Sequence, residues 1–364
     1  MNILVLGGTG AMGTHLVEIL KQQGNEVFVT SRHDYPSHRN VTYIRGDAHN
    51  EYFLKEVLVR RRWDAIVDFM IYTTAEFQHR MPQLLATTAQ YVFLSSSRVY
   101  ADSIEPITES SPRLLDVSQD MDYLATDEYA LAKAREENML HRNSGNENWT
   151  IIRPYITYSE NRLQLGILST GAWLSQALRG QTIVFSKDIA DRMTTLTYGY
   201  DVARGIAALI GKEKALGETF HITCDRPIRW NEVLNIYLDI LESKTGRRPN
   251  VLQLQKSPIM TPQVIYDRYY NRLFDNSKIG RFIKTDTFAS PHIGLRQCLE
   301  SFLENHPSGG RIEVKRTALF NRITGERTQL SEFDGITEKA GYFLLRYCPT
   351  LTETIERIYH KFNH

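Results

Sequence analysis

The first twenty residues constrain the fold more than any other part of the chain. Residues 1–6 form an apolar run suited to a buried parallel strand, residues 7–13 are rich in glycine, and residues 14–20 have the pattern of an amphipathic helix. A strand, a glycine turn and a helix in this order form the phosphate end of a dinucleotide site, because the free N–H groups at the helix N-terminus attract an anion. The residues expected to contact the dinucleotide here are Gly7, Gly10, Ala11, Met12 and Gly13.

Three of the four glycines in this turn have different expected roles. Gly7 permits the tight turn, Gly10 lets the backbone approach a pyrophosphate, and Gly13 allows close packing of helix and strand. Their spacing is three and three, where many dehydrogenases have two and three. A glycine turn in some other α/β protein is the alternative interpretation.

The first half of the chain alternates between strand and helix patterns. Further strands are predicted at 26–30, 41–44, 65–69, 91–95 and 150–153, with crossover helices that include 14–23 and 51–61. Such alternation builds a doubly wound parallel sheet of the Rossmann type, with helices on both faces. Ligands then gather beyond the carboxyl ends of the strands.

Composition excludes several classes of function. The chain carries 43 basic and 42 acidic residues, so no net field favours nucleic acid or an anionic membrane. No apolar run approaches the ~20 residues of a membrane span. The three cysteines and eleven histidines show neither a disulfide framework nor metal-ligand spacing. The first strand begins at Met1, which leaves no room for a signal peptide, and we expect a reduced cytoplasmic protein without a metal.

A tyrosine and a lysine lie four residues apart in the predicted helix 124–141. This spacing places Tyr129 and Lys133 on one helix face, one turn apart. A phenol exchanges protons poorly at neutral pH, and a nearby ammonium lowers its pKa by stabilising the phenolate. The pair therefore suits proton transfer. Tyr129 and Lys133 are also expected to contact the cofactor, because the lysine can bind the nicotinamide ribose. A core tyrosine beside a solvated lysine has the same spacing and is the alternative.

Three serines, Ser95, Ser96 and Ser97, stand at the end of the strand predicted at 91–95 and precede Val99 and Tyr100. The chain here resembles the extended short-chain dehydrogenase/reductases, the group of nucleotide-sugar epimerases and dehydratases. That family has its catalytic hydroxyl four places before the tyrosine of a Val-Tyr-Gly motif. The resemblance points to Ser96 as that residue, although Ala101 replaces the usual glycine. A hydroxyl that only caps the strand end is the alternative.

The resemblance covers residues 1–305 and implies further site residues. Asp47 and Pro154 match positions that contact the cofactor, and the implied substrate-binding residues are Arg98, Tyr155, Arg192 and Arg272. It also implies a dinucleotide-binding domain at 1–154 with return segments near 195–225, followed by a substrate-binding cap at 155–306. Residues 307–364 form an extension without an assigned role, in which 311–329 have the pattern of a hairpin.

The function that this resemblance implies is oxidation or reduction of a secondary alcohol or ketone of a nucleotide-linked sugar. Tyr129 is the expected acid/base, Ser96 orients the substrate oxygen, and Lys133 lowers the pKa of the tyrosine. Sequence does not separate epimerisation from simple reduction. Elimination of water by a 4,6-dehydratase is disfavoured, because Ser97 and Arg98 stand where those enzymes carry carboxylates.

The second predicted strand ends without an acidic residue that could accept from the 2′-hydroxyl of NAD. Ser31 and Arg32 stand there instead, and an arginine can bind the 2′-phosphate of NADP. We therefore expect NADP as the cofactor, with NAD as the alternative. We also expect a homodimer.

A second hypothesis for the function is that the chain is a catalytically silent member of this family that acts as a binding or regulatory protein, as some RNA-binding relatives do. Such relatives usually lose the tyrosine or the lysine, and this chain keeps both.

Overall fold

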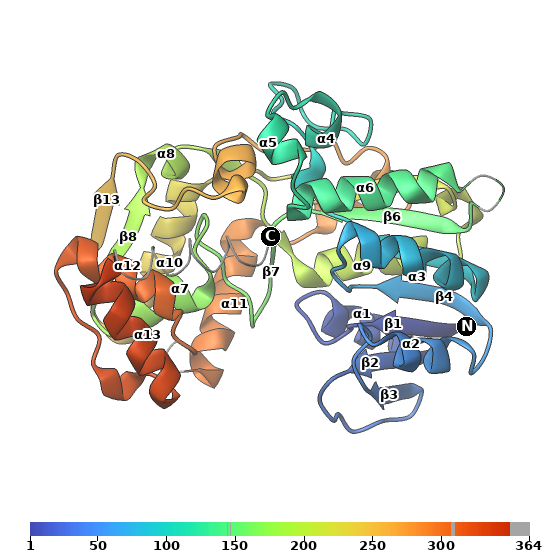
Figure 1. Ribbon diagram of the computed structural model, residues 1–364, viewed down its shortest axis with the longest axis horizontal. Coiled ribbons are helices and arrows are strands. Elements are labelled where there is room, and N and C mark those ends of the chain that lie inside the picture. The colour runs from blue at the N-terminus through green and yellow to red at the C-terminus, as the bar shows by residue number, and fades with distance from the viewer. Residues whose placement is uncertain (144, 146, 307–309, 350–364) are drawn as a thin grey trace. The chain divides into compact units, whose positions relative to one another are not determined.

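The computed structural model describes residues 1–143, 145, 147–306 and 310–349. It divides into two compact units, each coloured by residue number in Figure 1. Unit 1 contains Met1–Asn161, Arg192–Arg229 and Met260–Leu295; unit 2 contains Arg162–Asp191, Trp230–Ile259 and the described part of Arg296–His364. Residues 307–309 and 350–364, which belong to the predicted extension, lie outside the described residues.

Unit 1 is built on a seven-stranded parallel sheet. Its strand order is β11-β6-β5-β4-β1-β2-β3, so the chain reverses direction across the sheet between β1 and β4. The α/β fold predicted from sequence is confirmed, and the predicted strands agree with the observed ones within a few residues. The strands are β1 Asn2–Leu6, β2 Glu26–Ser31, β3 Val41–Arg45, β4 Trp63–Asp68, β5 Thr88–Leu94, β6 Trp149–Pro154 and β11 Glu218–Ile222.

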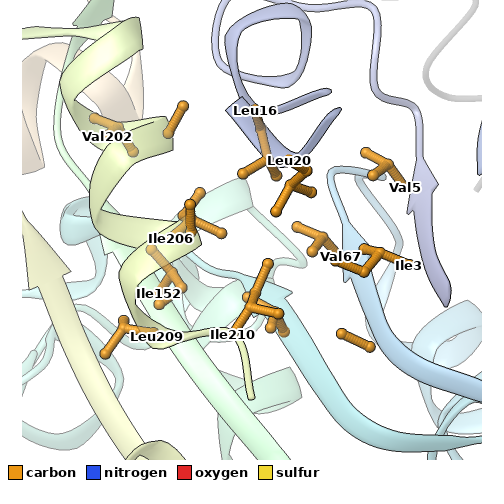
Figure 2. Packing of buried hydrophobic residues seen from close by; sticks show 14 of the residues in the cluster. Ile3, Val5, Leu16, Leu20, Val67, Ile152, Val202, Ile206, Leu209 and Ile210 are labelled. Atoms are coloured by element: carbon orange, nitrogen blue, oxygen red, sulfur yellow. The ribbon is translucent and has the colours of Figure 1, made fainter. Parts of the chain in front are cut away.

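Helices cover both faces of this sheet. One face carries α1 Gly13–Gln22 and α9 Gly199–Leu209, and the other carries α2 Glu51–Leu58, α3 Thr74–Ala86 and α6 Tyr129–Arg142. Figure 2 shows the first face, where Leu16 and Leu20 of α1 and Ile206 of α9 lie over the strand residues Val5 and Val67. Each such fully buried aliphatic side chain stabilises the fold by about 2 kcal/mol, which fixes α1 against the sheet.

The helix predicted at 124–141 starts five residues too early, since α6 spans Tyr129–Arg142 and Leu124 is the last residue of a separate short helix. That short helix, α5 Met121–Leu124, ends before a short loop. Glu128 ends the loop because its carboxylate accepts a hydrogen bond from the N–H of Ala130 (2.8 Å) and so caps α6. The other short elements of unit 1 are η1 Ser97–Val99, α4 Leu114–Val117, β7 Thr157–Tyr158, β9 Met193–Thr194, β10 Thr197–Tyr198, η2 Glu213–Ala215, β12 Ile228–Arg229, the π-helix η3 Val264–Arg268, η4 Ile279–Arg281 and η5 Thr285–Thr287.

Unit 2 is mostly helical, and the predicted hairpin at 311–329 was wrong. The segment forms a helix, α12, whose buried residues recur at helical spacing and which ends at Gly325 in the left-handed conformation (φ +77°). Thr324-Gly325-Glu326, within the predicted hairpin, therefore marks a helix C-terminus and not a hairpin turn. The elements are α7 Thr170–Leu178, β8 Ile183–Ser186, α8 Lys187–Ala190, α10 Trp230–Thr245, β13 Val251–Leu254, α11 Pro291–Asn305 (which starts in unit 1), α12 Val314–Thr324, η6 Leu330–Glu332 and α13 Gly335–Tyr347.

Within the part of the chain that the structure describes, no helix is both long enough and apolar enough to cross a membrane.

Candidate active site

The glycine turn connects β1 to α1 in a compact, fixed conformation. Gly7 has a positive φ of 68°, which favours glycine, and its N–H donates to the hydroxyl of Thr30 on β2 (3.1 Å). A side-chain Cβ at Gly13 would lie 2.6 Å from the backbone of Gly8. The turn and the first residue of α1 therefore touch, as the expected packing role of Gly13 requires.

Gly10 faces open space, in contrast to Gly13. A Cβ built on Gly10 would have no heavy atom within 4 Å. The N-terminus of α1 begins at Gly13 after Met12, which gives no side-chain cap, and its first turn has no acidic residue. Free N–H groups and room above Gly10 are what a dinucleotide phosphate needs, so the residues present fit such a cofactor.

The end of β2 presents a cation to solvent. Ser31 is buried and its hydroxyl accepts from the N–H of His33 (3.1 Å), whereas the side chain of Arg32 is exposed. The next carboxylate in the sequence, Asp34, pairs with Arg45 at the end of β3 (2.6 Å). Asp47 follows β3 in an exposed turn, where it accepts from the N–H of His49 (2.9 Å).

The three serines after β5 have different hydrogen-bond partners. Ser95 donates to the carboxylate of Glu137 (2.6 Å), and Ser97 donates to the carbonyl of Arg153 (2.8 Å). The Ser96 hydroxyl accepts from the N–H of Arg98 (3.2 Å), and among the described residues it donates its own proton to no protein group. Ser96 is therefore the serine whose proton remains available to a ligand.

Tyr129 is the first residue of α6, and Lys133 follows one turn later on the same helix. The guanidinium carbon of Arg98 lies 5.2 Å from the centre of the Tyr129 ring, and Arg98 forms an ion pair with Glu128 (2.6 Å). Arg98 thus contacts both Ser96 and Tyr129. The structure brings the predicted hydroxyl and the predicted phenol into one neighbourhood at the carboxyl end of the sheet.

Lys133 is enclosed, since only 1% of its side chain is exposed. Its ammonium donates to the Glu136 carboxylate (2.9 Å) and lies 4.5 Å from the centre of the Phe93 ring on β5. Burial raises the pKa of Glu136 to about 7, although the adjacent Lys133 acts in the opposite direction. Glu136 was missed in the sequence, where it is one of two adjacent glutamates on α6.

A second buried carboxylate, Asp68, ends β4 near the same lysine. It accepts hydrogen bonds from the hydroxyls of Tyr91 (2.8 Å) and Tyr72 (3.1 Å) and from the N–H of Met70 (2.9 Å). Burial raises the pKa of Asp68, against the effect of these donors and of Lys133. The sequence signal for this residue was an acidic side chain within an otherwise apolar strand.

The predicted substrate residues are in different environments. Arg272 is fully buried and donates to Asp267 (3.1 Å) and to the carbonyls of Tyr100 (3.0 Å) and Ala101 (2.8 Å), so it holds the backbone after the Val-Tyr motif. Tyr155 is buried, its ring centre 5.3 Å from that of Phe274. Arg192 is exposed.

Pro154 ends β6 opposite Ile222 of β11. No group of acidic, histidine or cysteine side chains among the described residues is arranged to hold a metal ion.

Comparison with known families gives one match over more than half of the chain. Residues 3–223 match the model of the NAD dependent epimerase/dehydratase family. The chloroplast stem-loop binding protein of 41 kDa b from Arabidopsis thaliana is 22% identical over 244 residues, which cover 63% of this chain and 60% of that protein. The 2′-dehydrokanamycin reductase of Streptomyces kanamyceticus is 22% identical over 236 residues, 64% of each chain. Both matches span less than two thirds of the relative's length.

Solved structures with the same fold include an epimerase from Methanothermobacter thermautotrophicus, with a TM-score of 0.67 and 18% identity, covering 85% of this chain and 94% of that one. The UDP-glucuronic acid 4-epimerase of Bacillus cereus, solved with UDP-glucuronic acid and NAD, has a TM-score of 0.62 and 19% identity over 84% of this chain and 99% of that one. At these identities the similarity establishes the fold.

Proposed function

Because the chain belongs to the NAD-dependent epimerase/dehydratase family, we propose that it oxidises or reduces a secondary alcohol or ketone of a nucleotide-linked sugar. The observation that carries this proposal is the arrangement of Ser96 and Tyr129. The one serine of three with an available proton and the tyrosine that begins α6 share Arg98 as a neighbour, which donates its backbone N–H to Ser96 and holds its guanidinium over the Tyr129 ring. A hydroxyl donor next to a phenol suits proton transfer at a carbinol oxygen.

Each residue has a defined role in this proposal. Ser96 donates a hydrogen bond to the reacting oxygen, and Tyr129 gives a proton to that oxygen or takes one from it. The ammonium of Lys133, one turn along α6, stabilises the phenolate and also binds the nicotinamide ribose of the cofactor. A nicotinamide cofactor, held at the glycine turn and α1, would supply or accept hydride when bound. Epimerisation results if sugar and cofactor stay bound between the two half-reactions, and net reduction results if they leave.

The proposed cofactor preference is for NADP. The exposed guanidinium of Arg32 follows β2 directly and suits bidentate contact with a 2′-phosphate, which the hydroxyl of Ser31 supplements. The nearest carboxylate in the sequence, Asp34, would repel that phosphate, but it is paired with Arg45. NAD complexes among structures of the same fold make NAD the alternative.

Water elimination is not part of the proposed reaction. Ser97 is fully buried and its hydroxyl is used by the carbonyl of Arg153, while Arg98 carries the wrong charge for an acid/base carboxylate. The carboxylate that does lie here, Glu128, accepts from Arg98, from the hydroxyl of Tyr123 (3.1 Å) and from the N–H that it caps. With those partners it is held as a structural group. A catalytically silent binding role is not favoured, because the chain keeps Ser96, Tyr129 and Lys133, which such relatives usually lose in part.

The test is a panel of nucleotide sugars incubated with the purified protein and either cofactor, followed by cofactor absorbance and product mass. We expect turnover of at least one sugar, loss of turnover in Tyr129→Phe, and nearly unchanged cofactor binding in that variant, because only the phenol oxygen is removed. Near-normal turnover by Tyr129→Phe would refute the assignment of the acid/base. Detection of a 4-keto-6-deoxy product would refute the exclusion of elimination.

A further inference from the structure

The buried surroundings of Lys133 contain more negative charge than one lysine balances. Glu136 approaches the ammonium from the same helix (2.9 Å), and Asp68 acts on it from the end of β4. Both carboxylates are at most 1% exposed. One oxygen of Glu136, Oε1, is buried and has no hydrogen-bond partner among the described residues. A buried carboxylate oxygen without a donor is costly when it is ionised.

The two carboxylates differ in how well their charge is stabilised. Asp68 receives three hydrogen bonds, from Tyr91, Tyr72 and the backbone of Met70, whereas Glu136 receives one, from Lys133. A proton shared by the site therefore resides on Glu136. Proton uptake there removes the charge that holds the ammonium, and it also gives the orphan oxygen a hydrogen to share.

Resting on the proposed function, we propose that Glu136 is a positioning residue that controls Lys133: ionised, it captures the lysine ammonium, and protonated, it releases that charge to the cofactor and to Tyr129. The inference needs no movement of the backbone. Lys133 and Glu136 are three residues apart on α6, and a lysine side chain can change partner by rotation about its own bonds.

The carboxylates that face Glu136 from neighbouring elements all raise the pKa of Glu136. Asp68 from β4 and Asp127 from the loop before α6 both raise the pKa of Glu136, after the larger effect of burial. Tyr72 and Tyr91, from the loop after β4 and from β5, are buried phenols whose own pKa values are raised. From α3, Arg80 lies over the Tyr72 ring and donates to the carbonyls of Ala48 (3.0 Å) and His49, so its guanidinium is engaged elsewhere.

The sign of the pH effect follows from this arrangement. Burial raises the pKa of Glu136 to about 7, so the residue is protonated below that pH and ionised above it. Lys133 is then available at low pH and captured at high pH. Cofactor affinity should therefore fall as pH rises through about 7, by roughly tenfold, the effect of one opposite charge beside an ammonium.

The experiment measures the dissociation constants of NADPH and NADH by fluorescence titration between pH 5.5 and 9. We expect Glu136→Gln to bind as the wild type does at pH 5.5 and about tenfold more tightly than the wild type at pH 9. Glu136→Asp, which keeps the carboxylate, should retain a pH-dependent step. Glu56→Gln on α2, where an exposed carboxylate is removed, is the matched control and should follow the wild type.

The outcomes separate the inference about Glu136 from the proposed function. A wild-type affinity that does not change around pH 7, or a step that persists unchanged in Glu136→Gln, overturns the inference, while the catalytic assignment stands if Tyr129→Phe is inactive. If Glu136→Gln does not fold, as judged by thermal unfolding, the inference is tested by the pH-dependent change in cofactor affinity of the wild type and by the shift of that change in Glu136→Asp. Failure of the wild type to bind either nucleotide overturns both the inference and the proposed function.

Discussion

Alanine at Gly10 should separate the role of the glycine turn in ligand binding from its role in the fold. A Cβ at Gly10 meets no atom within 4 Å, and the backbone there is not in the left-handed region, so alanine fits without strain. By restricting the unfolded chain, the substitution should leave the free energy of unfolding unchanged or raise it by up to about 1 kcal/mol.

The same methyl group would occupy the space in which we place the pyrophosphate. Contact atoms need about 3.5 Å, so the phosphates must withdraw and their hydrogen bonds to the N-terminus of α1 lengthen. Loss of about 1.4 kcal/mol of that interaction raises the dissociation constant tenfold, and we expect at least this for Gly10→Ala. Fluorescence titration with NADPH and NADH measures it.

Gly13→Ala is the matched variant, with the opposite expectation for stability. Its Cβ would lie 2.6 Å from the backbone of Gly8, about 1 Å closer than contact allows. Overpacking of this kind costs about 1–3 kcal/mol, which exceeds the gain in helix propensity of at most about 1 kcal/mol. Thermal unfolding should show a lower Tm for Gly13→Ala and not for Gly10→Ala. Wild-type cofactor affinity in a folded Gly10→Ala protein would refute the phosphate site.

Three further predictions test the site and its support. Ser96→Ala should lower kcat by about 10²-fold, the scale for one positioned donor, with little change in Tm. Ser97→Ala should lower Tm, because a buried hydrogen bond is lost. The reverse pattern would contradict the assignment of Ser96 as the catalytic serine. Arg32→Ala should abolish a preference for NADP over NAD in cofactor titrations, and equal wild-type affinities would make this wrong. Burial alone would raise the pKa of Glu137, but Arg153 and the other partners of the carboxylate lower that pKa. The ionised carboxylate of Glu137 therefore stabilises the fold fully at neutral pH, and this stabilisation is lost as pH falls below the ordinary value of 4.5. Glu137→Gln should therefore lower stability by about 3–5 kcal/mol at pH 7 and by less at pH 3, as measured by denaturant unfolding; an equal loss at both would refute the ion pair.

The sheet could be predicted from sequence because its signals are local. Buried parallel strands are continuous apolar runs, and the glycine turn fixes where the first strand ends and α1 begins. The hairpin predicted at 311–329 failed for the same reason, since Thr-Gly-Glu is locally compatible with a hairpin turn and with a helix C-terminus. Only the packing of Ala318 and Phe320 within unit 2 selects the helix.

Some features of the site could likewise be predicted from local sequence, and others depend on residues that are distant in the chain. Four-residue spacing places Tyr129 and Lys133 on one face from sequence alone, because both belong to one helix. The choice among three adjacent serines by hydrogen bonding needs Glu137 and Arg153, which come from α6 and β6 and are remote in sequence. Spacing from Tyr100 selects the same serine only through a family pattern.

The role of Glu136 as the partner of Lys133 could not be predicted from the sequence for a further reason. A lysine three residues before a glutamate on a helix is usually a solvated pair worth a few tenths of a kcal/mol. Here α3 packs against α6, Asp68 of β4 and Phe93 of β5 lie near the lysine, and the same spacing becomes a buried ion pair with an orphan oxygen and a carboxylate pKa near 7. The residues that we propose to carry the proton chemistry are thus visible in the sequence. The residue that we propose to regulate them gains its role only from burial, which three separate segments of the chain create together.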